Sequence, residues 1–438
     1  MALSAGAGKG VERVQTRLRT VVGASMIGTM IEWFDFFIYG VAAALVFNKL
    51  FFPEFDPLTG TLLAFTSYAL GFFARPLGGI IFGHFGDRIG RKKLLMLSLV
   101  IMGLSTAAIG LLPTYQQIGI AAPILLTLLR ILQGFAVGGE WGGAVLMVAE
   151  TAPARRRGFW TAFPQIGAPA GNLLAAAVFA IATASLSEAD FLAWGWRLPF
   201  LSSVVLVSIG WWLRRAVAES VVFELESRAA GVERFPLAEL FRRSKRALLE
   251  GAALRFGENL AYYIAATFAI TYFAEIRGGE RDIILNAVLI GAAIECLTMP
   301  LFALASDRWG RRPVYLAGAL AMAASFLFFF GWLDTLDPAT TIMAVTLTMV
   351  AHGAMYAPQG AFIAELFPTR LRYSGASVAY QATSILAGSL APIIALALYR
   401  HFEASWPVAA YAIAGCLVTA ASLFFVRETR GIDLRDAG

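Results

Sequence analysis

Twelve apolar stretches of 17 to 28 residues dominate this chain of 438 residues. About 20 apolar residues is the length that an α-helix needs to cross the hydrocarbon core of a bilayer. Hydrophobic residues make up 58% of the chain and charged residues only 15%, which leaves too little polar surface for a soluble globule. We therefore predict an all-α membrane protein with transmembrane helices at 20–47, 58–82, 94–112, 122–149, 159–184, 197–213, 248–274, 283–305, 314–332, 340–363, 374–398 and 407–426.

Two motifs occur twice along the chain. The segment 83–93, which contains Asp87, returns in shortened form at 306–312. The acidic and basic residues that follow the fourth apolar stretch return after the tenth at one constant offset: Glu150, Pro153, Arg155 and Arg157 recur as Glu365, Pro368, Arg370 and Arg372. A fixed-offset repeat in an apolar chain is typical of transporters built from two parallel repeats, with the substrate path between them.

The repeat divides the chain into three parts. We predict an N-terminal six-helix bundle at 1–213, a C-terminal six-helix bundle at 248–438 with a short tail, and a charged linker at 214–247. Most of the 35 Lys and Arg residues lie in every second loop and in both terminal segments. We therefore predict a protein that crosses the plasma (inner) membrane several times. By the positive-inside rule, these loops, the linker and both termini face the cytoplasm.

The net charge and the positions of the two cysteines argue against other classes of protein, such as nucleic-acid-binding and metal-binding proteins. The net charge of +6 is distributed by side of the membrane, so we expect the bilayer and no nucleic acid as the partner. The first twenty residues lack the short apolar core of a cleaved signal peptide. The two cysteines, Cys296 and Cys416, fall in apolar spans, so we expect neither a disulfide nor a metal site.

The duplicated loop and the fourth apolar stretch carry a family resemblance. The Gly-x3-Asp-Arg-x-Gly-Arg-Lys-Lys loop, together with Arg130-x-x-Gln133-Gly134, resembles the major facilitator superfamily over nearly the whole chain. Narrower strings resemble its metabolite:proton symporter branch: residues 32–36 (Glu-Trp-Phe-Asp-Phe), 75–79 (Arg-Pro-Leu-Gly-Gly), 133–142 (Gln-Gly-Phe-Ala-Val-Gly-Gly-Glu-Trp-Gly) and 194–200 (Trp-Gly-Trp-Arg-Leu-Pro-Phe).

This resemblance implies a secondary transporter that imports a small polar organic acid with protons by alternating access. Known members of the branch carry shikimate, dicarboxylates, ketoglutarate, citrate or zwitterionic osmolytes. The osmolyte carriers have an extended coiled-coil tail, whereas this chain ends soon after its last span, which favours an organic acid over proline or betaine. An efflux antiporter and a non-transporting sensor are the remaining alternatives, and we expect a monomer.

The chain shows no signature of chemical catalysis. A Gly-x4-Gly-Lys-Ser/Thr phosphate loop is absent, so the proton gradient and not ATP is the expected energy source, and no cofactor is needed. With three histidines, no Cys/His cluster and no candidate nucleophile triad, an enzyme is not supported.

The first span carries two acids in an apolar setting. Glu32, Asp35 and Tyr39 are spaced i, i+3 and i+7, so they share one face of a helix. A charge near the bilayer centre costs about 2.5–3.5 kcal/mol on insertion scales, so each such residue needs a reason. We predict that Asp35, with Glu32, binds the coupling proton and that Tyr39 contributes to substrate binding. Static pairing of Asp35 with a neighbouring arginine is the alternative.

The fourth, seventh and eleventh spans supply candidate substrate ligands. Arg130, Gln133 and Trp141 share a face of the fourth helix. The position that corresponds to Arg130 in the second repeat carries no charge, so the fold alone does not require an arginine there. This favours a role of Arg130 in anion binding over a structural ion pair. The predicted ligands of the other two spans are Arg255, Glu258, Asn259 and Tyr262 on the seventh helix and Tyr380 and Gln381 on the eleventh. Mutual neutralisation of Arg255 and Glu258, and simple helix–helix hydrogen bonding, stay open as alternatives.

The duplicated loops form a predicted gate. The resemblance implies a cytoplasmic latch, and the chemistry agrees, because glycines permit a tight turn and an acid and arginines there form contacts that switch between states. The predicted latch residues are Asp87, Arg88, Gly90, Arg91 and Glu150, where Arg91 holds Glu150, with Asp307, Arg308, Arg311 and Glu365 in the second copy. Positive charge that serves topology alone is the alternative, but it leaves the repeated Asp and Gly unexplained.

Overall fold

The computed structural model describes the backbone of residues 2–89, 91–138, 140–216, 240–242, 244–368 and 371–434. For residues 2–17, 80, 83–95, 140–141 and 214–216 it describes the backbone path only. In these described ranges the regular elements are helices, and no β-strand is present. The predicted all-α class is therefore confirmed.

The first half of the chain builds six long helical segments. Short π-helical turns interrupt two of them, and such widened turns often mark functional regions. The segments are α1 (Ala2–Ala42) with η1 (Ala43–Phe47) and α2 (Asn48–Leu50); α3 (Pro57–Ile89); α4 (Arg91–Gly110); α6 (Ala121–Val137) with α7 (Glu140–Thr151); α8 (Arg157–Ser185); and α9 (Glu188–Asp190) with η3 (Phe191–Gly195) and α10 (Arg197–Ala216). A single turn, α5 (Tyr115–Ile118), precedes α6.

The second half repeats this plan. Its segments are α13 (Lys245–Tyr263) with η4 (Ile264–Phe268), α14 (Ala269–Thr271) and η5 (Tyr272–Ile276); α15 (Arg281–Trp309); α16 (Arg311–Ser325) with α17 (Phe329–Leu333); α18 (Pro338–Leu366); α19 (Arg372–Thr383) with η6 (Ser384–Ser389) and α20 (Leu390–Phe402); and α21 (Trp406–Ser422). Each of the twelve predicted spans overlaps one of these segments, and the predictions 94–112 and 407–426 run past the helix ends at Gly110 and Ser422.

The segments differ in how clearly they fit a bilayer. Seven are long and apolar enough to cross it, and an eighth qualifies if the bent pair Glu188–Gly195 and Arg197–Leu213 is one span. Met96–Gly110 and Trp406–Ser422 are shorter apolar helices. The segment that begins with α13 is not among these, and it carries Arg255 and Glu258 in its middle.

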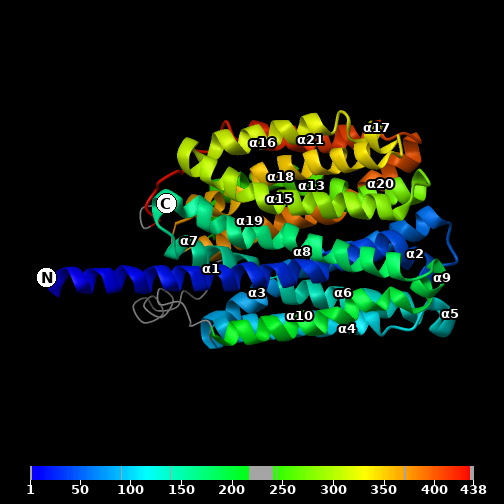
Figure 1. Cartoon of the computed structure of the whole chain (residues 1–438), viewed down its shortest axis with the longest axis horizontal. Coiled ribbons are helices and arrows are strands. Elements are labelled where there is room, and N and C mark those ends of the chain that lie inside the picture. Colours follow the sequence, from blue (N-terminus) through cyan, green and yellow to red (C-terminus); the bar gives the residue numbers. More distant parts are fainter. Residues whose placement is uncertain are drawn as a thin grey trace.

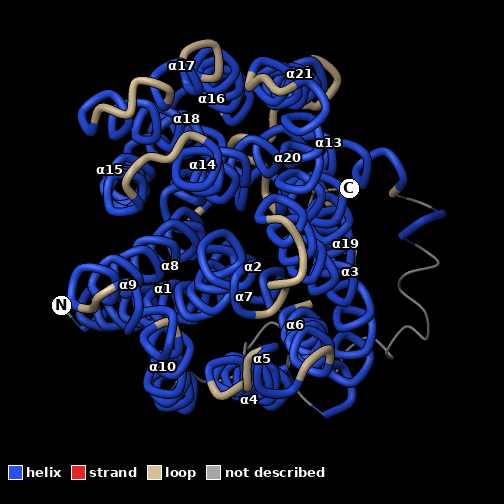
Figure 2. The backbone as a smooth tube through the Cα atoms, turned by 90° about the vertical axis from the view of Figure 1, so that its right-hand side faces the viewer, coloured by secondary structure: helices blue, strands red, loops and turns tan. Residues whose placement is uncertain are grey.

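The helices run roughly along the long axis of the molecule, and both chain ends lie at its left end in Figure 1. We call this the terminal end. Viewed along the helices, α1–α10 lie together below and α13–α21 above (Figure 2). The two groups meet where α8 packs against α15 and α18 and where α3 packs against α19 and α20. The linker predicted at 214–247 lies largely outside the described residues, so its boundaries stay a prediction.

Glycines bring α3 and α6 into backbone contact. A Cβ atom added at Gly134 would overlap the carbonyl oxygen of Gly71, and one added at Gly138 would overlap that of Arg75. Only a residue without a side chain permits such an approach. As a result, Arg130 on α6 lies directly against the backbone of α3, where its Nε donates to the carbonyl of Tyr68 at 3.5 Å.

Candidate functional site: a charged centre between two helix bundles

Arg130 lies in an aromatic enclosure in the middle of the first half. Its side chain is fully buried, and its guanidinium carbon lies 3.8 Å, 4.5 Å and 4.4 Å from the ring centroids of Phe36, Tyr39 and Tyr68. Each desolvated cation–π contact contributes on the order of 1–2 kcal/mol. The rings therefore stabilise a buried cation without neutralising it, which keeps its charge for a ligand.

Polar partners satisfy only part of this guanidinium. Nη1 of Arg130 donates to Gln133 Oε1 at 3.1 Å, and Gln133 Nε2 donates to Thr106 Oγ1 at 2.6 Å. Among the described residues, Nη2 of Arg130 and Nε of the buried Arg75 have no hydrogen-bond partner. A buried donor left unpaired costs about 1–3 kcal/mol, and a carboxylate can recover that cost.

The predicted acids of α1 lie in the same region. Asp35 and Glu32 are buried, with 1% and 4% of their surface exposed. The hydroxyl of Tyr39 lies 2.7 Å from that of Ser67. Arg75 stacks over Phe36 at 4.0 Å, so two guanidinium groups flank the ring that follows Asp35 in sequence.

In the second half, Arg255 occupies a site with more partners. Its guanidinium carbon lies 3.2 Å from the Tyr380 ring centroid. Nη1 donates to Gln359 at 3.0 Å and to Glu258 at 3.4 Å, and Nη2 donates to Ser384 at 3.3 Å. The predicted neutralising pair with Glu258 is thus present, within a wider network.

A buried imidazole joins two buried carboxylates behind Arg255. Nε2 of His352 lies 2.7 Å from Glu258 Oε1, and Nδ1 of His352 contacts Glu295 Oε1. All three side chains are at least 97% buried and come from α13, α15 and α18. We call these residues the Glu–His–Glu triad.

The two halves touch around this centre. Asn172 Nδ2 on α8 donates to the hydroxyl of Tyr262 at 3.1 Å, and Gln381 Nε2 on α19 donates to the carbonyl of Gly138 at 3.3 Å. The Phe37 ring of α1 lies 5.9 Å from the Tyr262 ring. Asn259 is buried beside Gly388. A Cβ atom added to Gly388 would lie 2.5 Å from the Oδ1 of Asn259. Predicted ligands of the second half, Tyr262 and Gln381, therefore lie where it contacts the first half.

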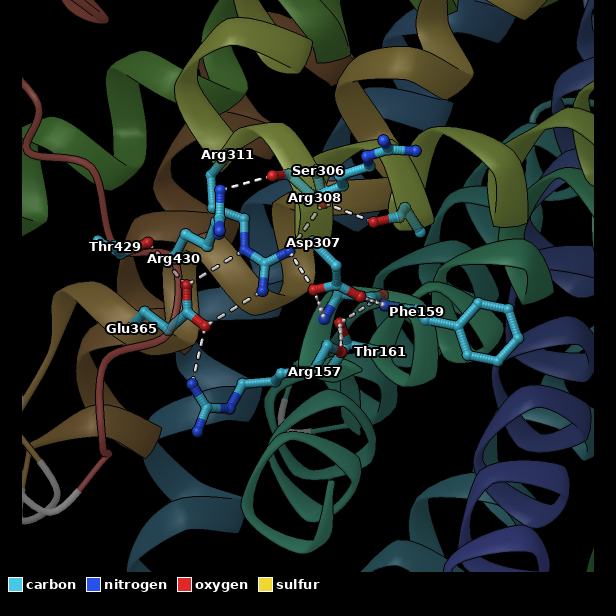
Figure 3. Close-up of polar contacts among 12 residues, drawn as sticks. Arg157, Phe159, Thr161, Ser306, Asp307, Arg308, Arg311, Glu365, Thr429 and Arg430 are labelled. Atoms are coloured by element: carbon cyan, nitrogen blue, oxygen red, sulfur yellow. Dashed lines mark hydrogen bonds and ion pairs between the residues drawn. The ribbon is translucent and has the colours of Figure 1, made fainter. Parts of the chain in front are cut away.

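A buried ionic network closes the terminal end (Figure 3). Glu365 on α18 accepts from Arg157 on α8 at 2.8 Å and from Arg311 on α16 at 3.4 Å. Arg311 also donates to Asp307 at 2.7 Å. Asp307 in turn accepts from the backbone N–H groups of Gly158 and Phe159, at the start of α8. A carboxylate from the second half thus caps a helix of the first.

Burial and neighbouring charge act in opposite directions on Arg311, which lies between two membrane spans. Burial lowers the pKa of the Arg311 guanidinium, but the carboxylates of Glu365 and Asp307 outweigh burial and raise this pKa above its usual range. Arg311 is therefore always charged in this network.

The sequence repeat appears in space as crossed pairs. Arg157 of the first half pairs with Glu365 of the second at 2.8 Å, and Arg372 of the second half lies 3.8 Å from Glu150 of the first. Each arginine also donates from Nε to a carbonyl eight residues before it. Arg372 is therefore one partner of Glu150. The side chain of Arg91, its predicted partner, lies outside the described residues.

The structure describes only some of the other predicted gate residues. Gly90 and the side chains of Asp87 and Arg88 lie outside the described residues, as does the side chain of Trp141. Arg308 is exposed, and its carbonyl accepts from Arg430 of the C-terminal tail. The tail also reaches the network through Thr429, whose hydroxyl donates to Glu365 at 2.7 Å.

The opposite end of the molecule holds its halves together with exposed contacts. Arg281 lies 3.4 Å from Glu188, and Arg400 donates to Thr59 at 2.8 Å. Glu188 is 67% exposed. Exposed ion pairs contribute about 0–1 kcal/mol, whereas removal of one partner of a buried pair costs about 3–5 kcal/mol. The two ends therefore differ in how sensitive their contacts are to loss of one partner, and the buried contacts of the terminal end are the more sensitive.

A comparison with protein families agrees with this duplicated architecture. The family model described as "Sugar (and other) transporter" matches twice, at residues 20–233 and 224–437. The chain belongs to this transporter family. The transporter is also similar in fold to the proton:xylose symporter XylE of the major facilitator superfamily, with a TM-score of 0.75 at 20% identity over 97% of this chain and 98% of the other. Its class is thus a membrane transporter and not an enzyme.

Curated relatives of the transporter cover almost its whole length. It is 42% identical to the shikimate transporter of Escherichia coli (strain K12), over 95% of this chain and 96% of the relative. It is 39% identical to the inner membrane metabolite transport protein YhjE of the same organism, with 94% of each chain covered. The proline/betaine transporter of that organism is 33% identical, over 96% of this chain and 86% of the relative.

His352 was not among the site residues predicted from the sequence. The missed histidine lies within the span predicted at 340–363, and an ionisable residue inside a span is itself a signal of function. Gln359, seven residues later on the same helix face, bonds to Glu258 at 2.9 Å and to Tyr315 at 2.7 Å. This i, i+7 pair was the available signal.

Proposed function

We propose that this chain is a proton-coupled symporter that imports a small organic acid across the inner membrane by alternating access. The transporter family and the inner-membrane relative support this location. In the proposed orientation the terminal end, with its basic loops, faces the cytoplasm, as the positive-inside rule requires.

The observation that carries the proposal is the pair of buried cation sites facing one interface. Arg130 Nη2 and Arg75 Nε in the first half have no hydrogen-bond partner among the described residues, and the Arg255 guanidinium in the second half stacks on the Tyr380 ring. A carboxylate bound between the halves gains charge-assisted hydrogen bonds that no described side chain supplies. Two opposed sites also explain why such a ligand draws the bundles together.

The closing contacts give the cycle its asymmetry. Both ends of the molecule are bridged, but the bridges at the terminal end are buried and those at the opposite end are exposed. The opposite end therefore opens first and at lower cost, and it admits substrate and proton from outside. Release to the cytoplasm requires separation of Glu365 from Arg157, the kind of two-state contact that a switch needs.

Uptake into proteoliposomes tests the proposal. We expect labelled shikimate, citrate or ketoglutarate to accumulate only when an inward proton gradient is imposed. Labelled betaine serves as the comparison substrate. It is a zwitterion, so it has a carboxylate like the organic acids but also carries a positive charge. Uptake of an acid that ignores the gradient would make the protein a facilitator, and uptake of betaine alone would replace the organic acid by an osmolyte.

Asp35→Asn is expected to lower the substrate accumulation ratio at least about tenfold for each unit of imposed pH gradient, because the amide cannot bind a proton and one coupled proton is lost. The measurement is the steady-state ratio of labelled acid inside and outside proteoliposomes with the membrane potential clamped at zero. Exchange of substrate at equal pH should persist, since the amide resembles the protonated acid. An unchanged ratio would remove Asp35 from the coupling step.

A further inference from the structure

The geometry points to a second proton-binding site in the second half of the molecule: the Glu–His–Glu triad of Glu258, His352 and Glu295 holds one dissociable proton in the closed state and releases it when the bundles part. This inference rests on the proposed proton-coupled function and extends it to two protons for each substrate.

Hydrogen-bond counting requires the extra proton. Both ring nitrogens of His352 face a carboxylate oxygen, Glu258 on one side and Glu295 on the other. A neutral imidazole has one N–H and one lone pair, so it donates to only one of these oxygens. At the other nitrogen two lone pairs would face each other. Either a second ring proton or a protonated carboxyl removes this repulsion, and each adds one proton to the group.

The charge balance gives the same answer. Arg255 contributes the nearby positive charge, and the two carboxylates contribute two negative charges in a region excluded from water. Without an additional proton the cluster would carry a net charge of −1, and burial of an unbalanced charge is strongly unfavourable. Oε2 of Glu295 has no hydrogen-bond partner among the described residues, so a full negative charge there is poorly stabilised.

The described surroundings offer no other positive charge to replace this proton. The elements packed on the triad contribute phenols and two thiols besides Arg255, and these groups are Tyr262 of α13, Cys296 of α15, Tyr315 of α16, Tyr356 of α18, Tyr380 of α19 and Cys416 of α21. The acids of α1, Glu32 and Asp35, belong to the other half. Because the three groups share one proton, its binding is a property of the triad and not of a single residue.

The triad is connected to the moving interface. The His352 ring lies 4.2 Å from the Tyr262 ring and 5.0 Å from the Tyr356 ring, measured between centroids. Tyr262 accepts from Asn172 of α8, and the carbonyl of Tyr356 accepts from Gln165 of α8. Separation of α8 from the second half therefore exposes the triad to water. Hydration stabilises the separate charges, so the proton enters from the outside solution and leaves to the cytoplasm.

Glu295→Gln tests the second site. The amide of glutamine donates to His352 Nδ1 while the ring donates to Glu258, so every contact is satisfied without the extra proton. With the potential clamped at zero and a gradient of one pH unit, labelled shikimate should accumulate about 100-fold in the original protein and about tenfold in Glu295→Gln. Glu280→Gln, an exposed acid at the start of the same helix, is the matched control and should keep the full ratio.

The outcomes separate the two proposals. Accumulation by the original protein together with an unchanged ratio in Glu295→Gln would overturn the triad site and leave the symporter intact. Absence of gradient-driven accumulation in the original protein, for shikimate and the other labelled acids alike, would overturn the symporter itself. If Glu295→Gln does not reach the membrane, the number of protons taken up per labelled shikimate by the original protein decides: two supports the triad, and one overturns it.

Discussion

Replacement of Arg130 by lysine is expected to reduce substrate uptake about 100-fold at subsaturating concentration. Lysine keeps the charge but loses the planar fork that binds a carboxylate in two places and stacks on Phe36, Tyr39 and Tyr68. Loss of a desolvated charged hydrogen bond costs about 2–5 kcal/mol, and every 1.4 kcal/mol is a factor of ten. The measurement is the initial rate of labelled acid uptake, normalised to transporter in the membrane.

Arg277→Lys is the matched control for this result. Arg277 also forms an ion pair, with Asp334 at 3.0 Å, but its side chain is 41% exposed and lies away from the charged centre. Its uptake rate should stay within about twofold of the original protein, because exposed pairs contribute about 0–1 kcal/mol. Equal rates in Arg130→Lys and Arg277→Lys would show that Arg130 binds no substrate.

Glu365→Gln is expected to shift the transporter toward the inward-open state by a factor on the order of 100. The change removes the negative charge that Arg157 and Arg311 share in the closed state, and removal of one partner of a buried pair costs about 3–5 kcal/mol. In the open state both arginines regain water, so only the closed state is destabilised. A differential cost of this size moves most of a two-state population.

Spin labels on either side of the network measure this shift. Cysteines placed at the exposed positions Arg155 and Trp309, with Cys296 and Cys416 replaced by alanine, report the separation of the two halves at the terminal end. The distance distribution should lengthen in Glu365→Gln. It should stay unchanged in Glu188→Gln, which removes an exposed inter-half pair at the opposite end. Identical distributions for the two variants would contradict the latch.

The agreement between prediction and structure is closest within single helices. Arg130 and Gln133 lie three residues apart, and the structure joins them at 3.1 Å. Arg255 and Glu258 have the same spacing and lie 3.4 Å apart. Helix geometry fixes such pairs once the helix is predicted, because residues three or four apart occupy one face. The aromatic enclosure of Arg130 combines rings from α1 and α3. The spacing of residues within α6 therefore could not predict it.

The partners that come from different helices are the ones that sequence reasoning missed or left open. His352 contacts Glu295 and Glu258, which precede it by 57 and 94 residues. Glu150 was assigned to Arg91, whose side chain lies outside the described residues, and the structure places Arg372 of the other half 3.8 Å from Glu150. The constant offset of the repeat showed that Glu150 and Arg157 have counterparts, but it did not show that the pairs cross between the halves.

The class of the protein, its twelve predicted spans, its duplication and its family follow from the sequence alone. The length of the apolar runs, the charge of the loops and the offset of the repeat are properties of the linear chain. In a bilayer an apolar run of this length forms a helix, because its backbone groups must hydrogen-bond within the segment. Which buried charges meet becomes clear only from the packed helices: the Glu–His–Glu triad, the enclosed Arg130 and the crossed Arg–Glu pairs. Such contacts depend on the rotation and close packing of helices far apart in sequence, which the glycine contact between α3 and α6 illustrates.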